Sequence, residues 1–161
     1  MILVDTNILS TFAKVNRLDL LEEVLGNFHI SPNVLEEVKR AEELGYPHAG
    51  EILEKVRNDE ILIACPREKE VEVMDRLPTS FGRGEKDCLA IALKRDALIV
   101  TNEQKVLNYC KRNGVDSARL NTILRELLKK EDMEQEDVRN LIDEIEKKDN
   151  LVVTDKDSIF S

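Results

Sequence analysis

Several features that mark common classes of protein are missing from this chain of 161 residues. It has three cysteines, Cys65, Cys88 and Cys110, an odd number without a CxxC pair, so we expect neither a disulfide framework nor a cysteine zinc site. Its apolar runs, such as Ala97 to Val100, are far shorter than the roughly 20 residues of a membrane span. The first residues meet a charge at Asp5 without a basic flank, so we expect no signal peptide. These absences predict a reduced, cytoplasmic protein with no membrane partner.

The chain also lacks an excess of basic residues. Its 24 lysines and arginines face 33 acids, for a formal net charge of −9, and this balance by itself argues against a nucleic-acid partner. The acidity is concentrated, however. Residues 131–161 carry 11 acids and 4 bases, which leaves residues 1–130 with a net charge of only −2. We interpret the acidic end as a solvated helix surface that lies away from any anionic ligand.

Short β-branched runs alternate with segments of helical period along residues 1–116. Ser31 and Pro32 suit the N-cap and first position of a helix that ends near Gly45. Residues 78–84 are expected to form a loop before a helix over residues 85–95. Strands are expected at residues 2–4, 28–30, 61–63 and 97–100, and near residue 115. This alternation predicts an α/β fold with a parallel sheet and right-handed crossovers.

Residues 117–161 have a different character. Apolar stripes over residues 120–128 and 138–145 predict two amphipathic helices, each with one apolar face. Residues 151–153 are expected to add an edge strand. We therefore divide the chain into a domain of residues 1–116 and a C-terminal helical extension, residues 117–161, which packs on the same domain or on a partner.

Two acids stand where an acid needs an explanation. Asp5 directly follows the first strand, and ligands gather at the carboxyl ends of parallel strands. Its alternative role is to cap the next helix. Glu37 lies three residues after Val34 and four before Ala41, in the expected buried stripe of its helix, whereas Glu36 faces water. An inward carboxylate is costly unless it is paired or binds a metal, so Glu37 is a candidate ligand.

Polar residues at the start of a later helix and after the fourth strand are further candidates for a site. Asp87 lies at a helix start, one turn from Ala90 and Ile91, which face the body of the protein. Glu85, two positions earlier, lies about 200° away in a regular helix, so it is either an additional site acid or a residue that stabilises the helix N-terminus. Residues 101–103 follow the fourth strand as Asp5 follows the first. Converging carboxylates would need a cation such as Mg²⁺ or Mn²⁺, which in turn implies a phosphate-bearing substrate.

Four stretches in order make the chain resemble the PIN-domain ribonucleases, a family best known for the VapC-type toxins of bacteria and archaea. The stretches are ILVDTNIL at residues 2–9, ISPNVLEEV at 30–38, GEKDCLAIAL at 84–93 and LIVTNE at 98–103. The resemblance covers residues 1–116. It implies a three-layer α/β/α fold whose parallel sheet has the strand order 3-2-1-4-5. Asp5 would then neighbour residues 101–103, because the first and fourth strands would lie side by side.

The resemblance also implies a site. Asp5, Glu37 and Asp87 match the three metal-cluster acids of the family, and Glu103 stands where the fourth acid is usually Asp. Asn7 and Thr101 resemble residues that orient the substrate or the acids. The implied activity is hydrolysis of RNA with Mg²⁺ or Mn²⁺, in which a metal-activated water leaves a 3′-hydroxyl and a 5′-phosphate. The implied partners are RNA, a second copy of the chain in a homodimer and a cognate antitoxin.

Other interpretations remain open from the residues. A haloacid-dehalogenase-type phosphatase would need a second Asp at the position of Asn7. A PIN-like protein that has lost turnover and serves in binding or assembly is the stronger alternative, because Glu103 replaces Asp and helices are added. Asp155 is a rival fourth acid outside the matched region. The bases nearest to the site, which could contact an RNA backbone, are Arg83, Lys86, Lys105, Lys111, Arg112 and Arg119.

Overall fold

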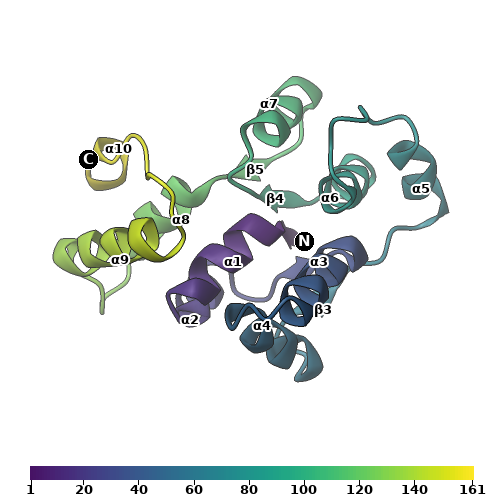
Figure 1. Cartoon of the computed structure of the whole chain (residues 1–161). Coiled ribbons are helices and arrows are strands. Elements are labelled where there is room, and N and C mark those ends of the chain that lie inside the picture. The colour runs from purple at the N-terminus through teal and green to yellow at the C-terminus, as the bar shows by residue number, and fades with distance from the viewer.

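Five short strands form one parallel sheet in the order β3-β2-β1-β4-β5 in the computed structural model, which describes residues 1–161 (Figure 1). Leu3 in β1 pairs with His29 in β2 and with Ile99 in β4, so β1 lies at the centre of the sheet. This order confirms the one that the family resemblance implied. The strands are β1 (Ile2–Val4), β2 (His29–Ile30), β3 (Leu62–Ile63), β4 (Leu98–Val100) and β5 (Ser117–Ala118).

Helices cover both faces of this sheet and give the expected three-layer α/β/α architecture. Figure 1 shows α7 above β4 and β5, α6 beside the end of β4, and α1, α2 and α4 below the strands. None of the helices combines the length and the apolar composition that crossing a membrane requires. The helices are α1 (Thr6–Lys14), α2 (Leu18–Leu25), α3 (Pro32–Glu43), α4 (His48–Arg57), α5 (Glu68–Met74), α6 (Arg83–Lys94), α7 (Gln104–Asn113), α8 (Leu120–Leu127), α9 (Gln135–Lys148) and α10 (Asp157–Phe160).

Local sequence explains where several elements begin. Ser31 is the N-cap of α3, as predicted, because its hydroxyl accepts a hydrogen bond of 3.2 Å from the backbone N–H of Val34. The helix α6 begins at Arg83, two residues before the expected start at residue 85, so the loop that precedes it is shorter than the predicted residues 78–84. The last strand lies at Ser117–Ala118, two residues beyond the expected position.

The expected edge strand at residues 151–153 is wrong. This segment is irregular, with Val153 buried and Val152 77 % exposed. The carboxylate of Glu146 accepts the backbone N–H of Val153 at 3.0 Å, so this donor is not free for a strand ladder. The run of apolar, β-branched residues that suggested a strand belongs instead to a loop that packs on the helices.

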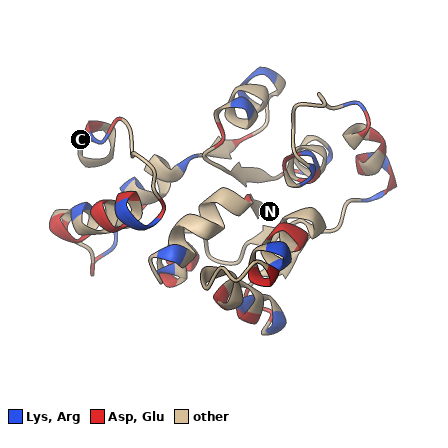
Figure 2. Ribbon diagram, viewed as in Figure 1, with Lys and Arg blue, Asp and Glu red and all other residues tan.

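The C-terminal helices pack on the α/β body. Helix α8 contacts α2, and α9 contacts α1 with its buried apolar stripe of Val138, Leu141, Ile142 and Ile145. Beyond the end of α9, Asp149 accepts hydrogen bonds from Thr11 and Lys14 of α1. Figure 2 shows acidic residues recurring along α9, at the end of the molecule opposite α5 and α6. The division at residue 116 stays a prediction.

Candidate active site

The carboxyl ends of β1 and β4 meet at Asp5 and Thr101. The two strands pair in register, and the hydroxyl of Thr101 donates a hydrogen bond of 2.9 Å to Oδ2 of Asp5. The other carboxylate oxygen, Oδ1, accepts the backbone N–H of Thr6 at 2.8 Å. Asp5 is therefore the N-cap of α1 and at the same time lies at the expected ligand-binding edge of the sheet.

Asp5 lies in a region of unbalanced negative charge. It is only 6 % exposed. Burial raises the pKa of its carboxyl from 3.8 to about 6, hydrogen bonds from Thr6 and Thr101 oppose the rise, and the charges of Glu37 and Glu85 add to it. A cation beside Asp5 would relieve this repulsion.

Glu37 faces Asp5 from the solvent side. The expectation that Glu37 is buried is wrong: the residue is exposed, because α3 buries only its first half and Leu44 at its end is 63 % exposed. The carboxylate nevertheless turns toward the site, where it accepts a hydrogen bond from the hydroxyl of Thr6. It also lies over Gly84, whose missing Cβ would come within 2.9 Å of Glu37 Oε1.

Asp87 is buried beneath these groups, at 1 % exposure. Its Oδ2 accepts the backbone N–H of Asn33 at 3.0 Å, and its Oδ1 accepts the side-chain amide of the same residue at 2.9 Å. Burial, followed by the charges of Asp5, Asp87 and Glu37, raises the pKa of the Cys88 thiol well above its usual range. These three predicted acids therefore lie around one buried cysteine.

Asn33 and Thr6 are the residues that sequence reasoning missed. The helical period places Asn33 on the face of α3 that it shares with Glu36, toward water, and Thr6 at the start of α1 suits helix capping. A signal for Asn33 was present, because the first-turn N–H groups of a helix need acceptors from elsewhere in the fold. Nothing local indicated that Asp87, 54 residues away, supplies that acceptor.

Glu85 stabilises the N-terminus of its helix, which is one of the two roles that the sequence left open. It lies in the first turn of α6, where its Oε2 accepts the backbone N–H of Gly82 at 2.9 Å. The ammonium of Lys105 lies 3.5 Å from the same oxygen. Glu85 still contributes to the raised pKa of Asp5, so its charge acts on the site even though its carboxylate is engaged elsewhere.

Thr101 contacts the two remaining candidate residues, Asn7 and Glu103. Its hydroxyl oxygen accepts the backbone N–H of Glu103 at 3.2 Å and lies 3.5 Å from the side-chain amide nitrogen of Asn7. Asn7 in turn accepts the backbone N–H of Asn102 at 3.3 Å. Glu103 is the N-cap residue of α7, but its side chain makes no capping hydrogen bond. Asp155 lies elsewhere, in a pocket beside α8.

The predicted ligands do not form a closed metal cage in this structure. No group of three or more His, Cys, Asp or Glu side chains is arranged so that it could hold an ion. Asp87 has both oxygens engaged by Asn33. The donor set nevertheless consists entirely of carboxylate oxygens, which is the chemistry that Mg²⁺ and Mn²⁺ prefer.

A protein-family model described as a PIN domain matches residues 1–156. The chain belongs to the PIN-domain family. Proteins of this family are typically nucleases that use divalent metal ions, so a PIN domain implies a nucleic-acid substrate. No curated protein matches the chain. The match extends past the four stretches that suggested the family and includes α8 and α9.

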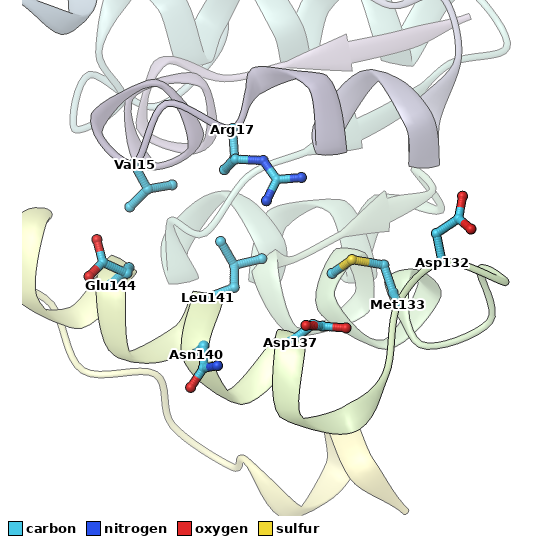
Figure 3. Close-up of a pocket in the computed structure, with 8 residues that line it drawn as sticks. All are labelled: Val15, Arg17, Asp132, Met133, Asp137, Asn140, Leu141 and Glu144. Carbon is cyan, nitrogen blue, oxygen red and sulfur yellow. The ribbon is translucent and has the colours of Figure 1, made fainter.

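A pocket of about 480 Å³ lies away from the candidate active site of this PIN domain, between α9 and the connection from α1 to α2 (Figure 3). The candidate acids of the active site do not line it. Its lining includes Arg17 but also three acids, Asp132, Asp137 and Glu144. An acidic lining disfavours a phosphate backbone, so this pocket is not a suitable nucleic-acid site.

Proposed function

We propose that this PIN domain is a Mg²⁺- or Mn²⁺-dependent ribonuclease that hydrolyses phosphodiester bonds. The observation that carries the proposal is the hydrogen bond between Thr101 and Asp5, because it joins the ends of two neighbouring strands at the edge where Glu37 also points. Together with the family match, this arrangement favours metal-assisted hydrolysis over a role in binding alone.

Asp5, Glu37 and Asp87 are the residues that would hold the ion, with Glu103 as the fourth acid. When bound, Mg²⁺ or Mn²⁺ supplies a Lewis acid that polarises a phosphoryl oxygen and activates water. The raised pKa of Asp5 supports a cation site, since the charged form of a buried carboxylate beside other acids is stabilised by a positive neighbour.

The surrounding side chains have positioning roles in this proposal. Thr101 and the backbone of Thr6 fix the two oxygens of Asp5, and the hydroxyl of Thr6 orients Glu37. Asn33 holds Asp87 against the first turn of α3. Asn7, which contacts the backbone of Asn102, is placed to orient the substrate. Fixing ligands before the substrate arrives lowers the cost of reaching the reactive geometry.

The test is cleavage of a single-stranded RNA library by the wild type and by Asp5→Asn, each with Mg²⁺, with Mn²⁺ and with a chelator. We expect cleavage by the wild type only with metal, and a loss of at least about 100-fold in Asp5→Asn. Asp143→Asn, which removes an exposed acid of α9, is the matched control and should cleave normally.

Two results would contradict the proposal. Cleavage by Asp5→Asn at the full rate would show that the acid cluster is not the catalytic centre. A wild type that binds RNA but does not cleave it with either metal would support the alternative of a weakened PIN domain that serves in binding or assembly. The toxin role, the cognate antitoxin, the homodimer and the cytoplasmic location stay predictions.

A further inference from the structure

A polar pocket of about 220 Å³ opens at the start of α8, on the β5 side of the candidate active site. The backbone N–H of Thr101 bonds to the carbonyl of Ala118 at 3.0 Å, and Arg119 follows directly. Neighbouring strands lie about 4.8 Å apart, so two strand spacings, roughly 10 Å, separate the backbone at Asp5 from the backbone at Arg119. The pocket is lined by Arg119, Asn121, Thr122, Arg125, Asp155 and Ser158.

Arg119 has no acceptor in the protein. The residue is half-buried, and its Nε is shielded from solvent without any hydrogen-bond partner. Arg95 is also half-buried, but its guanidinium pairs with Glu70 at 2.6 Å. A guanidinium nitrogen withdrawn from water without an acceptor is unfavourable, so the position of Arg119 Nε suits an anion that accepts its hydrogen bond.

The other side chains of the pocket are held in place. The guanidinium of Arg125 donates to the carbonyl of Ser158, at 2.9 Å from Nε and also from Nη2, which leaves its remaining nitrogen free. Asn121 donates to the carbonyl of Thr154 at 2.8 Å and so fixes the facing loop. Asp155 is the one acid in the lining, against two arginines. The pocket therefore offers a positive site whose donors are ordered in advance.

The start of α8 adds to this positive character. Its N-cap residue, Arg119, has no acceptor side chain and makes no capping hydrogen bond. The first backbone N–H groups of the helix accordingly lack a side-chain acceptor, and the helix dipole places partial positive charge at the same end.

We propose that the pocket formed by Arg119, Arg125 and Thr122 binds a backbone phosphate of the RNA strand that the active site cleaves. The inference rests on the proposed function, because it places the pocket and the catalytic acids along one strand of substrate. It assigns to the β5 side of the candidate active site a phosphate subsite that positions the strand without reading its bases.

The first test measures affinity for a single-stranded RNA oligonucleotide by fluorescence anisotropy, on the Asp5→Asn background that suppresses turnover. Arg119→Gln should weaken binding about tenfold at low salt. It should also reduce the dependence of log K on log salt by about 0.7, the value for one lost phosphate contact on a single strand. Arg76→Gln is the matched control, because it removes the same charge from an exposed arginine after α5. Equal affinity and equal salt dependence in the two variants would overturn the inference.

A second variant, Thr122→Glu, tests the inference even if Arg119→Gln has a folding defect. Thr122 is exposed in the first turn of α8, where an added acid interacts favourably with the helix dipole. Thr122→Glu should therefore keep or raise the unfolding temperature while it repels phosphate and weakens RNA binding. Undiminished RNA binding by this stable variant would also overturn the inference.

The outcomes separate this inference from the proposed function. If the wild type cleaves RNA and Arg119→Gln behaves as Arg76→Gln does, only the inference is wrong. If the wild type does not cleave RNA but Arg119→Gln weakens binding, the phosphate subsite is supported and the proposed activity is wrong. A wild type that neither binds nor cleaves RNA contradicts both.

Discussion

The hydroxyl of Thr101 donates a hydrogen bond of 2.9 Å to the carboxylate of Asp5, across 96 residues of sequence. Thr101 is fully buried, and the same hydroxyl oxygen accepts the backbone N–H of Glu103. One side chain thus ties the end of β4 to the first acid of the candidate site and to the start of α7.

Thr101→Val should remove this link while keeping the shape of the side chain. We expect a loss of about 1–2 kcal/mol in the free energy of unfolding, because Asp5 and the N–H of Glu103 each lose a partner. We also expect cleavage to fall more than about tenfold, since Asp5 is no longer oriented. Urea unfolding and initial rates measure the two effects. Thr101→Ser, which keeps the hydroxyl, should restore most of both, and full activity of Thr101→Val would refute the positioning role.

Asp5→Asn should have opposite effects on stability and on metal binding. Because burial raises the pKa of Asp5 to about 6 from 3.8, its charged form destabilises the fold increasingly as the pH rises through this interval. In a chelator at pH 7 the variant should therefore be more stable than the wild type, by about 3 kcal/mol for a shift of about two pKa units. Added Mn²⁺ should raise the unfolding temperature of the wild type but not of the variant. Equal thermal shifts in both proteins would place the ion elsewhere.

Gly84→Ala should reduce activity more than stability. A Cβ at this position would lie 2.9 Å from Glu37 Oε1 and 3.1 Å from Val34 Cγ2. The Glu37 carboxylate is the end of a flexible side chain, so it can move away at a cost of about 1–2 kcal/mol, but it then leaves the site. Gly50→Ala in α4 is the control, because the nearest atom that its Cβ would meet is Glu42 Oε2 at 3.7 Å, and it should stabilise the fold by up to about 1 kcal/mol. Normal cleavage by Gly84→Ala would show that this position of Glu37 is not needed.

Glu70→Gln should break the ion pair that joins α5 to the end of α6. Glu70 is 2 % exposed and accepts two hydrogen bonds from Arg95, at 2.6 and 2.8 Å. Loss of one partner of such a buried pair costs about 3–5 kcal/mol at neutral pH. The hydrogen bonds with Arg95 hold the pKa of Glu70 below its ordinary 4.5. Its stabilisation is therefore complete above about pH 4.5 and is lost as the pH falls through the lower, folded-state pKa.

Unfolding curves at pH 7 and in acid should show this difference narrowing as the pH falls. Glu68→Gln, which changes an exposed acid of the same helix, should change stability by less than about 0.5 kcal/mol. A constant difference between the wild type and Glu70→Gln across the pH range would contradict the ion-pair account.

Much of the fold could be read from local patterns. The β-branched runs predicted the strands, and the Ser31–Pro32 pair predicted the start of α3, because both depend on preferences of a few neighbouring residues. The same approach failed at residues 151–153, whose apolar, β-branched run would suit a strand but packs instead as a loop on the helices. A local run of β-branched residues cannot show whether a partner strand is available.

The sequence by itself determined the α/β alternation, the family to which the chain belongs and the acids worth examining, since these depend on residue types and spacing. The tertiary structure decided what those acids contact. Only the parallel pairing of β1 with β4 brings Thr101 to Asp5. Only the packing of α3 on α6 gives Asp87 its partner Asn33. The same packing leaves Glu37 exposed above Gly84. Such contacts join residues many positions apart, and chain spacing carries no information about them. For the same reason, the absence of a basic excess did not reveal the unpaired arginine beside β5.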